Sequence, residues 1–238
     1  MVTTRINLWS GPRNISTALM YSFAQRPDTL VFDEPLYAHY LLTTGIEHPG
    51  KSDILATMQN SGPRVIDEII LGDFDQSVLF FKQMTHHLVH ISLDFLQQTR
   101  HLILIRNPKK VLFSYGKVID QPTLLDIGIK QSFDLVQHLH QKNIPYTIVD
   151  SDRILKNPQK TLSLICQQMG IPFDDNMLRW EKGAIAQDGI WAKYWYANVH
   201  QSTGFEPYID KEITLAPHLQ AIYEQAKPYY DSLQKAAI

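Results

Sequence analysis

Five short apolar runs along the chain have the pattern of buried strands. They are residues 5–9 (RINLW), 29–32 (TLVF), 78–81 (VLFF), 102–105 (LILI) and 146–149 (YTIV). Continuous apolar runs of this length are typical of parallel strands that are covered on both faces. A polar turn or a helical pattern follows each run, so that strands and helices alternate. The sequence therefore predicts an α/β fold, a three-layer sandwich with a central parallel sheet flanked by helices.

Helical periodicity fills much of the chain between and after these runs. Asn107 is a predicted N-cap with Pro108 at the first helical position, and apolar residues then recur at helical spacing at Val111, Leu112, Tyr115, Val118 and Ile119. Further helices are predicted over residues 123–141, 158–170 and 215–237. The chain has no internal repeat and no linker-like stretch, so residues 1–238 are predicted to form a single domain.

The composition limits what the protein is expected to bind and where it is expected to be located. The net charge of −2 includes no basic excess, which argues against a nucleic-acid-binding protein. No apolar run approaches the roughly 20 residues that span a bilayer, and the first residues lack a signal-peptide pattern. Cys166 is the single cysteine, which rules out a disulfide within the chain and favours a reducing compartment. We expect a cytoplasmic protein without a membrane span.

The segment 8–23 (LWSGPRNISTALMYSF) joins the first predicted strand directly to a helix. Ser16 and Thr17 fall in the first helical turn, where unpaired backbone N–H groups and the helix dipole favour an anion such as phosphate. Arg13 adds a positive charge and the planar set of N–H donors of its guanidinium group. The segment is not a Walker A motif, because Arg13 stands where that motif has lysine. An ordinary capped helix after a strand is the alternative explanation.

Charged side chains follow other strands as well. Glu34, Lys82 and Arg106 each come just after a predicted strand, as Arg13 does. Since ligands of open parallel sheets bind beyond the carboxyl ends of the strands, we expect these side chains to share one edge of the sheet. Ser114, two helical turns after Arg106, could contact the same ligand, although Arg106 could also be an ordinary solvated charge.

Three of these segments resemble the sulfotransferase family. SGPRNISTALMYSF is similar to its 5′-phosphosulfate-binding loop, LIRNPKKVLFSY to its 3′-phosphate-binding segment, and residues 145–173 to the strand, turn and helix downstream. The resemblance implies a P-loop NTPase-like sulfotransferase fold and, as donor, 3′-phosphoadenosine 5′-phosphosulfate (PAPS), with no metal. It assigns the 5′-phosphosulfate to Arg13, Asn14, Ile15, Ser16 and Thr17. It assigns the 3′-phosphate to Arg106 and Ser114.

Two departures from the family pattern stand out. Arg13 replaces the lysine of the cytosolic enzymes and is closer to the carbohydrate-type branch. The Gly-rich, Lys-containing loop near the C-terminus is not recognisable, and DGIWAKYWYANVHQSTGF (188–205) stands in its region. Three polar residues of this segment are weaker candidates for donor contacts: Lys193, His200 and Ser202.

Sulfuryl transfer needs a base that takes the proton of the acceptor hydroxyl. Glu34, in FDEPLYAHYL (32–41), is similar to the Glu-Pro segment of carbohydrate-type sulfotransferases, although it could instead cap a helix begun by Pro35. The rival is His86 or His87, because cytosolic sulfotransferases have a lysine followed closely by a catalytic histidine. Lys82 would then contact the transferred group.

The sequence predicts sulfuryl transfer to a hydroxyl of a small-molecule or carbohydrate acceptor. An aromatic group could form a lid over that acceptor or simply pack on the core: Trp180, Trp191, Tyr194, Trp195, Tyr196 and Phe205. Two alternatives stay open: a kinase-like phosphotransferase using ATP and magnesium, and a non-catalytic nucleotide-binding protein. The missing Walker A lysine, and the lack of an aspartate ending a predicted strand, count against the kinase. Apolar positions of the last helix could dock on the core or on a second copy, which makes a homodimer possible.

Overall fold

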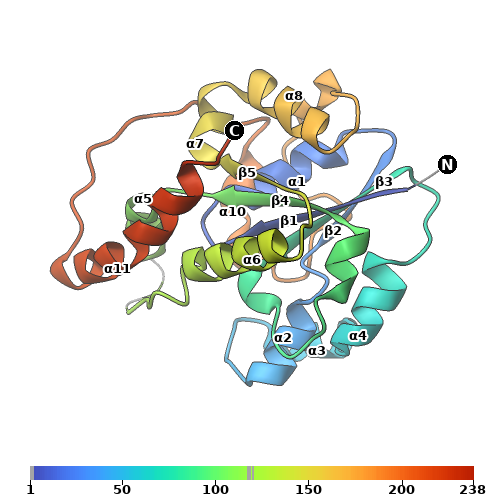
Figure 1. Cartoon of the computed structure of the whole chain (residues 1–238), viewed down its shortest axis with the longest axis horizontal. Helices are drawn as coiled ribbons and strands as arrows, with labels where there is room; N and C mark the ends of the chain where they lie inside the picture. The colour runs from blue at the N-terminus through green and yellow to red at the C-terminus, as the bar shows by residue number, and fades with distance from the viewer. Residues whose placement is uncertain (1–2, 117–118, 120) are drawn as a thin grey trace.

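The computed structural model describes residues 3–116, 119 and 121–238. Its centre is a sheet of five parallel strands in the order β2-β3-β1-β4-β5 (Figure 1). The strands are β1 (Thr4–Ser10), β2 (Thr29–Asp33), β3 (Val78–Met84), β4 (Arg100–Ile105) and β5 (Tyr146–Asp150). Each contains one of the five apolar runs, so the predicted strands are confirmed. Helices cover both faces, and the fold is the predicted three-layer α/β sandwich.

Side chains alternate between the two faces of the sheet and build two separate cores. Ile6, Leu8 and Phe80 pack under helices on one face, whereas Trp9 and Phe81 pack on the other. The first face is covered by α1 (Ser16–Ala24), α7 (Ser151–Lys156) and α8 (Pro158–Gln168). The second is covered by α4 (Gly62–Val65), the π-helix Ile66–Ile70, α5 (Pro108–Tyr115), α6 (Ile129–Gln141) and α11 (Pro217–Gln234).

A third apolar cluster lies apart from the sheet cores. It joins Tyr37, Ala38 and Leu41 to Trp191 and Tyr196, far along the chain. The elements that form it are α2 (Tyr37–Thr44), α3 (Lys51–Thr57) and α9 (Ala192–Trp195), followed by α10 (Ala197–Gln201). Short 3₁₀ turns complete the described elements: Thr85–His87, Asp94–Gln98 and Asp175–Leu178. Among the described helices, none has the length and apolar character of a bilayer span.

The strand ends differ from the prediction. β3 continues to Met84, so Lys82 lies inside the strand rather than after it, because its backbone pairs with both neighbours: Leu8 and Asp33 stand opposite Lys82. Aspartates end β2 and β5, at Asp33 and Asp150, so the expectation that no strand ends in aspartate is wrong. Both carboxylates accept hydrogen bonds from protein donors.

Helix boundaries also shift. The helix predicted over 123–141 begins only at Ile129, because Gly128 takes the left-handed conformation (φ 73°). Before it, the chain forms a turn in which the Thr123 backbone N–H donates to the Asp126 carboxylate. The last helix is Pro217–Gln234, and α7 occupies residues 151–156, which no prediction covered. Asn107 and Asn157 cap α5 and α8 as side-chain acceptors. Val118, expected in the helix after Pro108, falls outside the described residues.

Candidate functional site

A cavity of about 790 Å³ opens beyond the carboxyl ends of the strands. The loop after β1, the turn after β2, the end of β3, the start of the β4–α5 segment and residues 191–206 all contribute to its wall. The main candidates for the donor site and for catalysis all line it: Arg13, Asn14, Ile15, Ser16, Thr17, Glu34, Lys82, His86, Arg106 and Ser114. The expected gathering at one sheet edge is therefore present.

The loop between β1 and α1 has an unusual backbone. Arg13 and Ile15 both adopt positive φ, at 58° and 49°, although neither is glycine and Ile15 is β-branched. Such conformations cost about 1–3 kcal/mol each and concentrate at functional sites. Ile15 occupies the N-cap of α1 and no side chain caps the helix in the described structure, so the N–H groups of its first turn lack a side-chain acceptor. The ordinary capped helix is therefore excluded.

Two arginines meet at this loop. Arg13 Nε donates to Ser114 Oγ at 3.0 Å, and an Arg106 guanidinium nitrogen donates to the Arg13 carbonyl at 2.6 Å. Burial lowers the pKa of Arg106, and Asp152 and Arg13 act on it in opposite directions. The Nε of Arg106 is buried without a hydrogen-bond partner among the described residues. An anion placed here would pair with two guanidinium groups and with the start of a helix.

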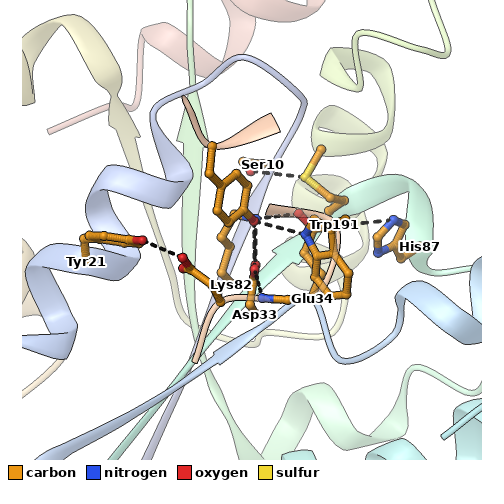
Figure 2. Close-up of polar contacts among 11 residues, drawn as sticks. Ser10, Tyr21, Asp33, Glu34, Lys82, His87 and Trp191 are labelled. Carbon is orange, nitrogen blue, oxygen red and sulfur yellow. Dashed lines mark hydrogen bonds and ion pairs between the residues drawn. The ribbon is translucent and has the colours of Figure 1, made fainter. Parts of the chain in front are cut away.

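A buried ion cluster, the Lys82 cluster, consists of Asp33, Glu34 and Lys82 (Figure 2) together with Tyr196, and all of these except Asp33 line the cavity. The ammonium group of Lys82 donates to Asp33 Oδ1 at 2.9 Å, to Glu34 Oε1 at 2.5 Å and to the Tyr196 hydroxyl at 2.7 Å. These three acceptors use the three protons of an ammonium group. Lys82 therefore has no donor left for a sulfuryl oxygen, which argues against the contact expected from the sequence.

Glu34 projects from a turn that is itself strained, with φ 46°. Its side chain binds Lys82 instead of capping a helix, because α2 begins at Tyr37 with Leu36 as N-cap; the capping alternative is therefore wrong. Burial raises the pKa of Glu34, and the Lys82 ammonium opposes that rise. The second oxygen of Glu34, Oε2, lies 3.9 Å from His87 Nε2. A carboxylate of raised pKa with one oxygen free is a suitable general base.

The two adjacent histidines lie between tyrosine rings. His87 stacks on Tyr37 with centroids 5.0 Å apart, and His86 meets Tyr40 edge-on at 5.1 Å. Burial lowers the pKa of His86 to about 4 and that of His87 well below its usual range, so both rings are neutral at neutral pH. The Nδ1 atom of each is buried without a partner among the described groups. His86 lines the cavity and remains the rival base.

The aromatic segment divides between the cavity and the core. Trp191, Trp195 and Tyr196 line the cavity, as the lid interpretation predicts. Trp180 and Phe205 instead pack into the core beside α1, and Tyr194 is exposed.

Of the three weaker candidates for donor contacts in this segment, one lines the cavity and two do not. Ser202 lines the cavity, where it accepts a hydrogen bond from the indole of Trp180. Lys193 pairs with Asp53 at 3.8 Å, and His200 pairs with Asp188 at 2.9 Å; neither is part of the cavity wall.

Sequence reasoning missed Asp33 and recognised Tyr196 only as an aromatic ring. The one available signal was the pair of adjacent acidic residues that ends the second apolar run, and it does not reveal that Asp33 faces Lys82. That relation comes from the parallel register of β2 and β3. Within the described residues, no group of three or more His, Cys, Asp or Glu side chains is arranged to hold a metal ion.

Comparison with known proteins agrees with this geometry. A family model described as Sulfotransferase domain matches residues 4–237. Two Arabidopsis thaliana proteins, named branched-chain-amino-acid aminotransferase-like proteins 1 and 2, are 36% and 37% identical to the chain over 230 residues. These alignments cover 96% of this chain and 41% of each relative, so the chain spans less than half the length of the curated relatives it matches.

Solved structures share the fold. The sulfotransferase domain of the Synechococcus PCC 7002 olefin synthase superposes with a TM-score of 0.57 at 19% identity, covering 94% of this chain and 95% of that one. A sulfotransferase from Alicyclobacillus acidocaldarius gives a TM-score of 0.57 at 10% identity, covering 99% and 96%. The family match over nearly all residues and the shared fold lead to one conclusion: the chain belongs to the sulfotransferase family.

Proposed function

We propose that this protein transfers a sulfuryl group from PAPS to a hydroxyl of a small-molecule or carbohydrate acceptor. One observation supports this proposal above the others. Two arginines meet at an uncapped, strained helix start in the same cavity as a buried carboxylate of raised pKa. A sulfuryl donor needs the first arrangement, and an acceptor hydroxyl needs the second.

At the donor end, Arg13 and the first-turn N–H groups of α1 bind the 5′-phosphosulfate. Arg106 and Ser114 bind the 3′-phosphate. During transfer, the bond between sulfur and the bridging phosphate oxygen breaks, and negative charge grows on the departing 3′-phosphoadenosine 5′-phosphate. Fixed cations and helix N–H groups stabilise that charge without having to reorganise.

At the acceptor end, the hydroxyl oxygen attacks sulfur in line with the leaving phosphate, as in phosphoryl transfer. Glu34 takes the hydroxyl proton on its oxygen that does not face Lys82. The neutral His86 is the second candidate for this step, since its unpartnered Nδ1 could accept a proton. Trp191 and Trp195 line the wall beside the acceptor and limit the access of water.

Calorimetric titration with 3′-phosphoadenosine 5′-phosphate tests the donor site. We expect micromolar binding by the wild type and its loss in Arg13→Ala and in Arg106→Ala. Arg64→Ala is the matched control, because Arg64 is an exposed arginine that pairs with Glu68 and is absent from the cavity wall. Binding of ATP with magnesium in place of this nucleotide would favour a phosphotransferase. Nucleotide binding without turnover on any acceptor would favour a non-catalytic protein.

A further inference from the structure

The two adjacent carboxylates of the Lys82 cluster differ in how their oxygens are used. Both oxygens of Asp33 have protein donors: Lys82 and Tyr196 on Oδ1, Tyr196 and the Gly189 backbone N–H on Oδ2. Among the described residues, Glu34 receives a hydrogen bond from Lys82 on Oε1 and from no group on Oε2. The side chain of Asp33 is 1% exposed, whereas that of Glu34 is 11% exposed and lines the cavity. Asp33 is thus committed to the protein, and Glu34 keeps an oxygen for a ligand.

Two distant parts of the chain fix this arrangement. The parallel register of β2 and β3 sets Asp33 beside Lys82. The Tyr196 hydroxyl, from the junction of α9 and α10, accepts from Lys82 and from the indole N–H of Trp191 and donates to Asp33 (Figure 2). A buried ammonium between two carboxylates is costly to desolvate and often adds no stability over an apolar substitute. Its position in a cavity wall, in contact with Glu34, therefore favours a role in the chemistry of Glu34.

We propose that Asp33, Lys82 and Tyr196 are positioning residues, which hold Glu34 by one oxygen and leave its other oxygen facing the acceptor. This inference rests on the proposed function, in which Glu34 takes the acceptor proton. Lys82 is the direct link to Glu34. Asp33 and Tyr196 act through Lys82, since their hydrogen bonds fix the position of its ammonium group.

The charges around Glu34 act in opposite directions. Lys82 lowers the pKa of Glu34, whereas the Asp33 carboxylate raises it, in addition to the rise that burial causes. The other titratable groups facing Glu34 are the neutral ring of His87 and the hydroxyls of Tyr37 and Tyr196. Removing the charge of Asp33 should therefore shift Glu34 titration to lower pH, and removing the charge of Lys82 should shift it to higher pH.

Titration of carboxyl-labelled glutamate by NMR tests this inference directly, with the Glu34 signal assigned by its loss in Glu34→Gln. We expect the Glu34 midpoint to fall by roughly one pH unit in Asp33→Asn and to rise by at least as much in Lys82→Met. Asp53→Asn, an exposed aspartate that pairs with Lys193, is the control and should leave the midpoint unchanged. Absent or same-direction shifts in folded variants would show that Asp33 and Lys82 do not act on Glu34 as the structure implies, whereas a merely structural cluster would leave turnover unchanged in a folded Tyr196→Phe protein.

Turnover separates this inference from the proposed function. In Tyr196→Phe we expect kcat to fall about tenfold while donor affinity stays at the wild-type value, because Lys82 loses one of its three acceptors. An unmoved Glu34 midpoint in Asp33→Asn overturns the inference even if PAPS is used. Opposite shifts in a protein that binds no donor would retain the positioning role and overturn the proposed function. If Lys82→Met does not fold, the direction of the Asp33→Asn shift decides alone.

Discussion

Arg13 and Ser114 lie 101 positions apart in the sequence, yet Arg13 Nε donates a hydrogen bond to Ser114 Oγ at 3.0 Å. The contact joins the loop after β1 to the C-terminal end of α5. The family resemblance assigns these two segments to the 5′-phosphosulfate and to the 3′-phosphate of one donor. The bond therefore couples the two halves of the proposed donor site before any ligand is present.

Removing the Ser114 hydroxyl should weaken donor binding. In Ser114→Ala the guanidinium of Arg13 loses its acceptor and its fixed orientation, and a hydrogen bond to a charged group is worth about 1.5–3 kcal/mol. We expect the Kd for 3′-phosphoadenosine 5′-phosphate to rise about tenfold in calorimetry. Ser163→Ala removes an exposed hydroxyl on α8 and is the control. An unchanged Kd in a folded Ser114→Ala protein would contradict this reading.

Gly11 allows the loop to approach the turn before α6. A Cβ built there would lie 2.3 Å from the carbonyl oxygen of Ile127, so Gly11→Ala must move backbone. We expect a loss of about 1–3 kcal/mol in urea unfolding, together with weaker donor binding because Arg13 is displaced. Gly45→Ala is the control: it has a left-handed backbone (φ 70°) but open space, and should cost about 1 kcal/mol without affecting binding. Equal binding by both variants would show that this contact does not shape the site.

The choice of base can be made by two conservative variants. Glu34→Gln keeps an oxygen for Lys82 but cannot take a proton, so we expect kcat to fall by about 10²–10⁴-fold with donor affinity retained. His86→Gln should retain most of the rate. Single-turnover measurements with radiolabelled PAPS and a panel of phenols and sugars provide the test. The reverse ranking of the two variants would assign the proton transfer to His86.

His101 should make the fold sensitive to acid. Trp9 Nε1 donates to its Nδ1 at 3.1 Å, and its Nε2 lies 2.9 Å from the Leu96 carbonyl. Because Nδ1 accepts, the ring must be neutral with its proton on Nε2, which donates to that carbonyl. Burial lowers the pKa of His101 from 6.5 to about 4. Between those values the unfolded chain binds a proton that the folded chain does not, so stability falls as pH falls, by up to about 3 kcal/mol.

Urea unfolding at several pH values checks the role of His101. The slope of the unfolding free energy against pH measures how many more protons the unfolded chain binds than the folded one. In His101→Gln we expect this number to decrease by about one between pH 6.5 and pH 4. His140→Gln replaces an exposed histidine of α6 and should leave the slope as it is. A slope that is the same in both variants would show that His101 titrates normally.

Besides its packing on the core, the last helix contacts the end of β5 through a buried hydroxyl. Tyr230 donates to Asp150 Oδ2 at 2.6 Å, and Gln234 donates to the Tyr230 oxygen at 2.8 Å. In Tyr230→Phe the buried Oδ2 of Asp150 loses the hydroxyl donor, while Oδ1 keeps the Asp152 backbone N–H, so we expect a loss of about 1–3 kcal/mol and a lower Tm by calorimetry. Tyr229→Phe, beside Phe133, is the matched control and should be nearly neutral. Equal Tm values for the two variants would remove this role.

The sequence by itself determined the strands and which cations lie together at one edge of the sheet. A strand that is buried on both faces is apolar along its length, so a short stretch of sequence is enough to predict it. Because the strands are parallel, the cations that follow them lie at the same edge of the sheet. The ends of the strands could not be predicted from the sequence where a polar residue is buried inside a strand. Lys82 looked like the end of a strand, because nothing local shows that its charge is neutralised inside the sheet.

Only the tertiary structure decided which side chains contact one another in the cavity wall. The order of the strands places β3 between β1 and β2, and the register then sets Asp33 against Lys82. The fold also separates Trp191 and Tyr196, at the cavity, from Trp180, in the core. The Asp33–Lys82 contact joins residues 49 positions apart, and the Tyr196–Asp33 contact joins residues 163 positions apart. Local preferences contain no information about such pairs, because packing and hydrogen bonding across the whole chain select them together.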